Sequence, residues 1–282
     1  MNRHCKDPPC LPQLMSPAPE RRLDCLPWPE IAELAQRKGS TVLWPLGATE
    51  QHGPHLPLGT DALFADRVAD AVLARLDGDL PIVRLPLQSL GFSPEHRGFP
   101  GTISLPAQLL LSLVEAVGRD LQAAGFQRLV LLNAHGGQIA LLEAAARQLH
   151  AACPDLGVLP CFLWKGLEGL GSLIPEPERS EGLHAGLAET SLMLHLAPQQ
   201  TRASREPDGL GVEAAAPPGW SLEGAAPCAW LTAEISRSGV IGDPRGASPS
   251  LGADLFERLV AGWWLRLDGL LRSEWPPMAT RK

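Results

Sequence analysis

The chain has 282 residues, 45% of them hydrophobic, and a formal net charge of −7 at pH 7. The length fits one large α/β domain or two small ones. The charge is spread along the sequence without a basic patch, so we expect no nucleic-acid partner. No apolar run approaches the roughly 18 residues of a membrane span, and no secretory signal is visible near the start. We therefore expect a cytoplasmic protein without a membrane partner.

Six cysteines occur, and no two of them form a Cys-x-x-Cys pair. In a chain of this length we interpret them as free thiols of a reducing compartment. Three of them lie in residues 1–26, which are rich in proline and charge and are expected to form a disordered N-terminal tail. One domain is then expected over residues 27–275.

Strands and helices alternate through the first half of that domain. A short helix over residues 29–38 has a proline at its start, and Gly39 ends it. Hydrophobic patterning then predicts strands and helices in turn. The predicted strands cover residues 41–46, 81–87, 128–133 and 157–164, and the predicted helices cover residues 61–76, 106–124 and 138–152. This alternation predicts an α/β fold with a mostly parallel sheet and helices on both faces.

The pattern is looser in the second half. Residues 199–228 are rich in proline, glycine and alanine, and they fit a lid, an oligomer contact or a disordered excursion. Trp263, Trp264 and Trp275 are expected to serve packing or an interface. The other elements predicted here are a loop over residues 165–183, a helix over 184–196, a strand over 229–235 and a final helix over 249–272.

A polar cluster follows the first predicted strand. Glu50 and His52 are two residues apart, so in an extended segment both side chains can point the same way. Asp61 stands where a helix N-cap would be. Carboxylates and imidazoles are ordinary ligands of zinc, manganese and iron(II). A metal site is one interpretation, and a polar loop with a capping aspartate and surface histidines is the other.

A second polar turn follows the third predicted strand. His135 is succeeded there by Gly136 and Gly137. Alone, such a histidine is more often a turn residue bonded to backbone. Parallel strands, however, end at the same edge of a sheet, so this turn and the first cluster should open together. The two glycines allow close approach of a substrate to the backbone, and their N–H groups can stabilise a developing oxyanion.

Five segments of the chain together resemble the creatininase (creatinine amidohydrolase) family. The most specific is residues 44–61, and the others follow in the family's order, so that the resemblance extends over about residues 42–252. The further segments are residues 91–105, 133–138, 184–191 and 239–248. The resemblance implies a three-layer α/β/α sandwich with a mostly parallel central sheet. It also implies a homo-oligomer, for which a hexamer is one candidate.

The resemblance further implies an amidohydrolase with two divalent metal ions per subunit, zinc being expected and manganese or iron being alternatives. Glu50 and His135 would bind one metal and His52 the other, while Asp61 would bridge both. His184 matches the family's catalytic histidine, and we assign it the proton transfer to the leaving nitrogen.

Glu189 matches the family's glutamate before a Thr-Ser pair, and it is a candidate metal ligand or orienting partner. Residues five apart on a helix differ by about 140° around its axis, so His184 and Glu189 can share a face only if His184 precedes the helix. The chain departs from creatininase at Gly136 and Gly137, where creatininase has an aromatic residue and a ligand glutamate. Glu189 or water would then complete the second metal's ligands. Without the aromatic side chain the wall of the substrate pocket is smaller, which argues against creatinine as substrate.

Substrate contacts are expected from Gly136, Gly137 and Glu95. His96, beside Glu95, could also line the pocket. For Glu95 and His96 a polar surface loop is an equally good interpretation.

These features predict a metal-dependent amidohydrolase that cleaves a C–N amide bond of a small cyclic or linear amide through a metal-activated water. The histidine-glycine-glycine turn looks closer to the family's formylamide deformylases and mycofactocin-type peptidases, which are the alternative among enzymes. A non-catalytic binding or assembly subunit is the alternative from another class. Metal analysis discriminates, because such a subunit would purify without stoichiometric metal.

Overall fold

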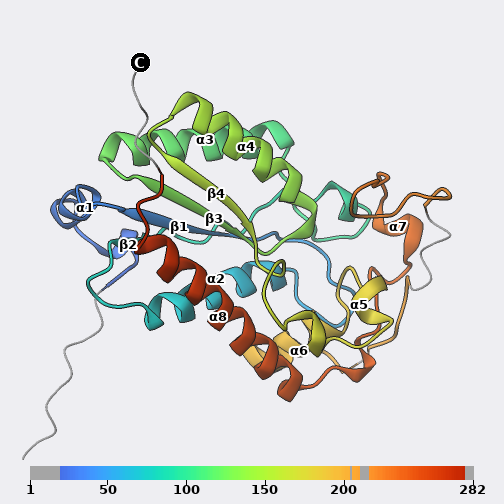
Figure 1. Ribbon diagram of the computed structural model, residues 1–282. Coiled ribbons are helices and arrows are strands. Elements are labelled where there is room, and N and C mark those ends of the chain that lie inside the picture. Colours follow the sequence, from blue (N-terminus) through green and yellow to red (C-terminus); the bar gives the residue numbers. More distant parts are fainter. Residues whose placement is uncertain (1–19, 204, 210–215, 277–282) are drawn as a thin grey trace, which may run out of the picture.

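The computed structural model describes residues 20–203, 205–209 and 216–276. Its centre is a sheet of four parallel strands in the order β2-β1-β3-β4, with helices on both faces (Figure 1). The strands are β1 (Thr41–Leu46), β2 (Ile82–Arg84), β3 (Arg128–Asn133) and β4 (Gly157–Phe162). The α-helices are α1 (Trp28–Ala35), α2 (Thr60–Arg75), α3 (Ala107–Ala124), α4 (Ile139–Ala152), α5 (Glu178–Glu181), α6 (Leu187–Leu196), α7 (Thr232–Ile235) and α8 (Pro249–Leu271).

Side-chain alternation along the strands divides the core into two apolar layers. In β1, Val42 and Trp44 pack on one face and Leu43 on the other, and in β3, Leu129 and Val130 divide in the same way. The first layer is completed by α1, α3 and α4, and the second by α2, α6 and α8. All six residues of β1 and of β3 are buried, as expected of central parallel strands. The expected three-layer α/β/α sandwich is therefore confirmed.

Two helical glycines offer a matched test of this packing. A Cβ on Gly118, in α3, would lie 2.2 Å from Leu149 Cδ2 of α4, whereas a Cβ on Gly269, in α8, meets no atom within 4 Å. We expect Gly118→Ala to lower the free energy of unfolding by about 1–3 kcal/mol through overpacking. Gly269→Ala should raise it by about 0.5–1 kcal/mol through helix propensity. Urea unfolding measures both, and stabilisation by Gly118→Ala would contradict the close packing of α3 on α4.

The second predicted strand is shorter than expected, because only Ile82–Arg84 pair as β2. The predicted strand over residues 229–235 is wrong: Thr232–Ile235 form α7. A local cap and a tertiary contact outweigh strand propensity there: the Glu234 carboxylate accepts from Leu231 N at 2.8 Å, and the Thr232 hydroxyl lies 2.6 Å from His96 Nδ1. The loop over residues 165–183 also contains the single turn of α5.

The segment before α1 contacts the sheet edge. Arg84 N donates to Arg21 O at 2.7 Å, and the Arg21 guanidinium donates to Leu80 O and Ile82 O. Residues 1–19 of the expected tail lie outside the described residues, whereas Arg21 and Arg22 contact β2. Within the part of the chain that the structure describes, no helix is both long and apolar enough to cross a membrane.

Candidate metal centre

Loops from two neighbouring strands bring the polar residues together. β1 and β3 are parallel and in register from Thr41↔Arg128 to Leu46↔Asn133, so the loops that follow them open at one edge. Glu50 and His52 come from the first loop, His135 follows β3, and Asp61 is the second residue of α2. All four side chains are at least 97% buried. The expected convergence of these residues is present.

Asp61 lies between two groups of donor atoms. His135 Nδ1 is 3.1 Å from Glu50 Oε1 and 3.2 Å from Asp61 Oδ2. On the other side, His52 Nε2 is 3.4 Å from Asp61 Oδ1 and 3.9 Å from Glu189 Oε2. Each group has the spacing of a metal-ligand set, and the two groups share Asp61. One carboxylate therefore presents a separate oxygen to each group.

Several of the atoms that could bind a metal in this cluster make no hydrogen bond. Both carboxylate oxygens of Glu50, His52 Nε2 and Asp61 Oδ2 are buried and accept or donate no hydrogen bond. Buried polar atoms normally have a partner, because leaving them without one costs about 1–3 kcal/mol each, and more for charged groups. A cation in each group would satisfy these atoms, so the residues present fit a metal centre.

Backbone carbonyls set the ring tautomers of two of the histidines. His52 Nδ1 lies 3.2 Å from Glu50 O, and His135 Nε2 lies 3.0 Å from Phe92 O. A carbonyl oxygen can only accept, so in the neutral ring the facing nitrogen carries the proton. The other nitrogen of each ring then turns a lone pair toward the carboxylates, which is the arrangement of metal-binding histidines.

The cluster concentrates negative charge in a buried space. Burial lowers the pKa of His52, but Asp61, Glu189 and Glu50 outweigh it and raise the pKa to about 9. Burial likewise opposes the charged form of His135, yet Glu50 and Asp61 raise its pKa well above the usual value. Protonated imidazoles thus balance the carboxylates. Divalent cations would supply the same positive charge and release those protons.

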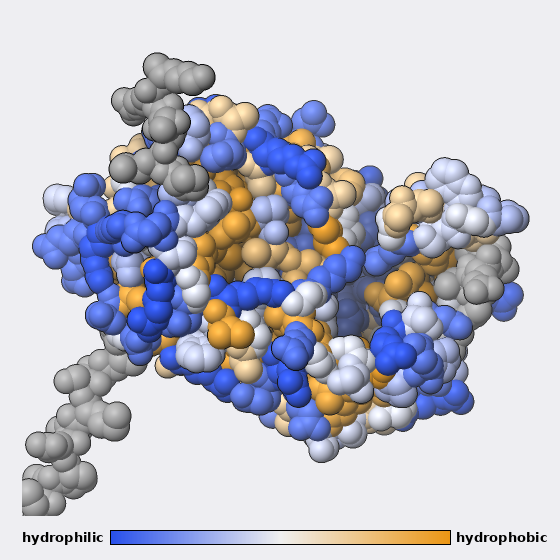
Figure 2. Space-filling view, in the orientation of Figure 1, coloured by the Kyte–Doolittle hydropathy of each residue, from blue (hydrophilic) through white to orange (hydrophobic). Residues whose placement is uncertain are grey.

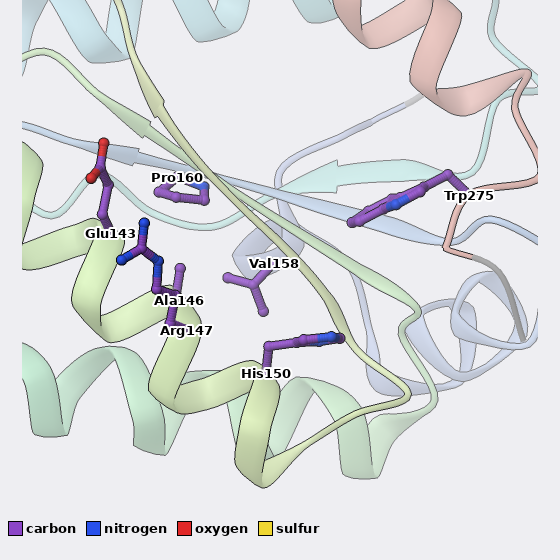
Figure 3. A pocket seen from close by; sticks show the side chains of 7 residues that line it. All are labelled: Glu143, Ala146, Arg147, His150, Val158, Pro160 and Trp275. Carbon is purple, nitrogen blue, oxygen red and sulfur yellow. The ribbon is translucent and has the colours of Figure 1, made fainter. Parts of the chain in front are cut away.

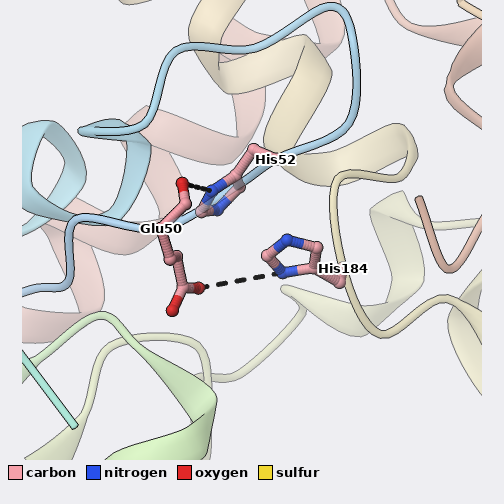
Figure 4. Close-up of side chains that lie close together, drawn as sticks. All are labelled: Glu50, His52 and His184. Carbon is pink, nitrogen blue, oxygen red and sulfur yellow. Dashed lines mark hydrogen bonds and ion pairs between the residues drawn. The ribbon is translucent and has the colours of Figure 1, made fainter. Parts of the chain in front are cut away.

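His184 precedes α6 instead of lying in it. Residue 184 forms an antiparallel bridge with Ile241, and the helix begins at Leu187, so the predicted start at residue 184 is three residues too early. His184 Nε2 lies 2.7 Å from Gln51 O, and Nδ1 faces Glu50 Oε1 at 3.9 Å (Figure 4). Burial, followed by the repulsion from His52, holds the pKa of His184 well below its usual value. The ring is neutral at pH 7, with a free lone pair at Nδ1.

Glu189 lies in the first turn of α6 and joins the same cluster. Because His184 lies before the helix, the two side chains can reach one cavity in spite of their spacing. One oxygen of Glu189 accepts from Ala185 N at 2.6 Å and also faces His52. Burial raises the pKa of Glu189 to about 7, although His52 opposes the shift.

Glu95 lies against the glycine turn. It belongs to the 3-10 turn Pro94–His96, and its Oε1 is 3.3 Å from His135 Nε2. A Cβ on Gly137 would lie 1.8 Å from that oxygen, whereas a Cβ on Gly136 would have its nearest atom at 3.8 Å. Gly137 therefore makes room for the Glu95 carboxylate. All three residues line the pocket described below.

Three further polar residues border the centre. His96 Nε2 is 3.6 Å from Glu50 Oε1, and His96 Nδ1 contacts the side chains of Gln51 and Thr232. Burial is the main reason that the pKa of His96 is below its usual value. Gln51 lies within the segment of residues 44–61 but is not among the predicted site residues, and no motif marks Thr232. Thr232 in particular comes from the segment predicted to be a strand, 136 residues from His96 along the chain.

The centre opens into a pocket of about 910 Å³. Trp164 forms part of its wall beyond β4. Leu222 and Cys228 come from the described part of residues 199–228, and Trp230 follows that segment. Figure 2 shows the molecule hollowed between its main body and the lobe that carries α7. Pockets of about 300–1,000 Å³ accommodate drug-sized ligands.

A second, smaller pocket of about 380 Å³ lies between α4, β4 and Trp275 (Figure 3). Its His150 is bonded through Nδ1 to Leu156 O at 2.8 Å. Trp275 packs over Gly157 at the start of β4, and Trp263 is buried with its N–H on Leu163 O. Both tryptophans serve packing, as expected, and the carboxylate and imidazole cluster belongs to the larger pocket.

Comparisons with known proteins agree with this architecture. A family model for creatininase, described as creatinine amidohydrolase, matches residues 24–266. The mycofactocin precursor peptide peptidase of Mycobacterium tuberculosis (strain ATCC 25618 / H37Rv) is 36% identical over 263 residues, which are 86% of this chain and 96% of that protein. The creatinine amidohydrolase of Pseudomonas putida is 28% identical over 262 residues, 89% of this chain and 96% of that protein. A solved zinc–zinc form of a creatininase variant matches with a TM-score of 0.73 at 25% identity, covering 90% of this chain and 100% of the other.

Proposed function

Because the chain belongs to the creatininase family and is a hydrolase of C–N bonds, we propose that it is a metal-dependent amidohydrolase that cleaves an amide bond with a metal-activated water. One observation carries the proposal: the two oxygens of Asp61 face two separate groups of buried donor atoms. Divalent metals in such a site lower the pKa of a bound water to about 7, which makes it a nucleophile at neutral pH.

The ligand assignment follows from the two groups. Glu50 and His135 would hold one cation, His52 and Glu189 the other, and Asp61 both. The solved zinc–zinc relative supports two zinc ions per subunit, with manganese or iron(II) as alternatives that the same ligands accept. Gly137 has no side chain that could bind a metal, so in this proposal Glu189 supplies the missing ligand of the second cation.

His184 carries the proton transfers in this proposal. Its neutral ring has a lone pair at Nδ1 on the cluster side, while Nε2–H is held by Gln51 O. Nδ1 can therefore accept a proton from the attacking water and pass it to the leaving nitrogen. An amine is a poor leaving group without this proton, so the transfer is required for the C–N bond to break. Gly136 leaves the backbone open to the substrate in the wall of the same pocket, whereas the space beside Gly137 is filled by the Glu95 carboxylate.

The substrate proposed is a peptide-like amide. The 910 Å³ pocket with Trp164 and Trp230 in its wall has room for more than a small cyclic amide. The 36% identical relatives are named for a precursor peptide, which points in the same direction. A small cyclic amide such as creatinine is the second candidate, supported by the name of the Pseudomonas relative, and a formamide is a third.

A hydrolysis screen tests the function. The metal-reconstituted protein would be assayed on short peptides, formamides and cyclic amides, with amine release as the readout. We expect turnover on at least one peptide-like amide and its loss after chelation. Turnover that persists without metal, or a metal-loaded protein inert toward all three classes, would reject the proposal. Light scattering of the same sample tests the proposed homo-oligomer.

The glycine turn gives a sharper test. In Gly137→Ala the new methyl group would meet Glu95 Oε1 at 1.8 Å and His135 Nε2 at 2.7 Å, so both side chains must move. We expect kcat/KM to fall by about 10–100-fold, the typical effect of disturbing the groups that orient a metal ligand. Gly136→Ala is the matched control and should stay within a few-fold of the parent, because its Cβ has open space. Equal kcat/KM for the two variants would show that the Glu95 position does not matter.

A further inference from the structure

His96 borders the centre without having been given a role. Its ring is 98% buried, stacks on His184 with ring centroids 4.1 Å apart and lines the large pocket. With Glu50 and Glu95 it forms another group of metal-ligand spacing. Two roles are open to the ring: a further metal ligand through Nε2, or a hydrogen-bond donor through the same atom. The position of its proton decides between them.

The neighbours of Nδ1 determine where that proton is. The side-chain amide of Gln51 is fixed in orientation, because its Oε1 accepts from Gly53 N at 2.9 Å and its Nε2 donates to Gly239 O at 3.0 Å. The second hydrogen of the same NH₂ group is left to point at His96 Nδ1, 2.8 Å away. An amide nitrogen is a donor only. His96 Nδ1 therefore accepts, and in the neutral ring the proton is on Nε2.

This arrangement is the reverse of that at the ligand histidines. At His52 and His135 a backbone carbonyl accepts from one ring nitrogen, so the other nitrogen turns a lone pair toward the cluster. At His96 the Gln51 amide donates to Nδ1, so Nε2 turns an N–H toward the cluster. That N–H is not consumed by Glu50, since 3.6 Å exceeds the 2.7–3.2 Å typical of an N–H···O bond. The Thr232 hydroxyl, 2.6 Å from Nδ1, can donate to the same lone pair.

We infer that His96 is a fixed Nε2–H donor that binds the carbonyl oxygen of the scissile amide and stabilises it as it gains negative charge. The inference rests on the proposed hydrolase function. The stacking of His96 on His184 places the donor beside the group that handles the proton. An amide bound across the two rings would present its oxygen to one and its nitrogen to the other. His96 gives up no proton in this role, so the reaction's balance is unchanged.

Kinetics and metal content test the donor role together. In His96→Ala we expect kcat to fall by about 10²–10³-fold, the usual loss for one oxyanion donor, with KM within a few-fold and bound metal unchanged. His96→Gln, whose side-chain N–H can take the same position, should recover about tenfold or more of that loss. Loss of one metal equivalent in both variants would make His96 a ligand and overturn the inference. So would a kcat in His96→Ala within a few-fold of the parent.

The proton position has a readout that needs no substrate. In ¹⁵N-histidine spectra of the zinc-loaded protein, assigned with His96→Gln, we expect His96 to be protonated at Nε2 and bare at Nδ1. In Gln51→Glu, a carboxylate behind the ring would move the proton to Nδ1 and lower kcat as strongly as His96→Ala. A proton on Nδ1 in the parent, or a metal-bound Nε2, would overturn the inference even if no amide were hydrolysed. Absence of any amidase activity alone would instead reject the proposed function.

Discussion

Asp61→Ala is expected to lose both metal ions at once and to abolish turnover. The reason is that Asp61 Oδ1 faces His52 while Oδ2 faces His135, so one substitution removes an oxygen from each ligand group. Changes in the partners of metal ligands alone cost about 10–100-fold in metal affinity, and the loss of a shared ligand should exceed that at both positions. Metal stoichiometry after dialysis, together with kcat, is the measurement.

Two further variants separate bridging from a general disturbance. Asp61→Asn keeps the shape of the side chain at the start of α2 but removes its charge, and it should also lose both metals. Of the two groups that share Asp61, His52 belongs to only one, so His52→Ala should lose about one metal equivalent of the two. Full metal content in Asp61→Ala, or loss of a single equivalent, would reject the bridging role of this carboxylate.

His184→Ala is expected to keep its metal and to lose kcat by about 10²–10⁴-fold, the range of general acid–base catalysis. The ring is held by Gln51 O at 2.7 Å, and its Nδ1 lies 3.9 Å from the nearest Glu50 oxygen. At these distances the His184 ring is not needed to hold a cation in either of the two groups that share Asp61. Steady-state kinetics and metal analysis on the same preparation check both halves of the prediction.

His195→Ala provides the control for His184→Ala. His195 is an exposed residue of α6 and lies outside the residues that line the large pocket. Its loss removes an imidazole from the same segment without touching the centre, so kcat should remain within a few-fold of the parent. If His184→Ala retained normal turnover, or lost its metal in parallel with activity, the proton-transfer role would be wrong.

Much of the centre could be predicted because it depends on local patterns and one rule of topology. The strands before Glu50 and before His135 are continuous apolar runs, and parallel strands end at one edge. Those facts place Glu50, His52, Asp61 and His135 together before any coordinates are known. The two-layer core follows for the same reason, since alternation along β1 and β3 assigns each side chain to a face.

The remaining features depend on contacts between residues far apart in the sequence. His184 looks helical in its local pattern, but its backbone pairs with Ile241, and the helix therefore begins later. The role of His96 depends on Gln51 and on Thr232, 45 and 136 residues away. The space taken by Glu95 depends on the absence of a side chain at Gly137. None of these juxtapositions has a periodic or local signal.

Anomalous diffraction from crystals of the zinc-reconstituted protein would show whether Asp61 holds a pair of cations. We expect two peaks about 3.5–4 Å apart, one among Glu50, Asp61 and His135 and the other among His52, Asp61 and Glu189. Zinc bound only elsewhere on the protein, or a cluster that stays free of metal at saturating zinc, would contradict it.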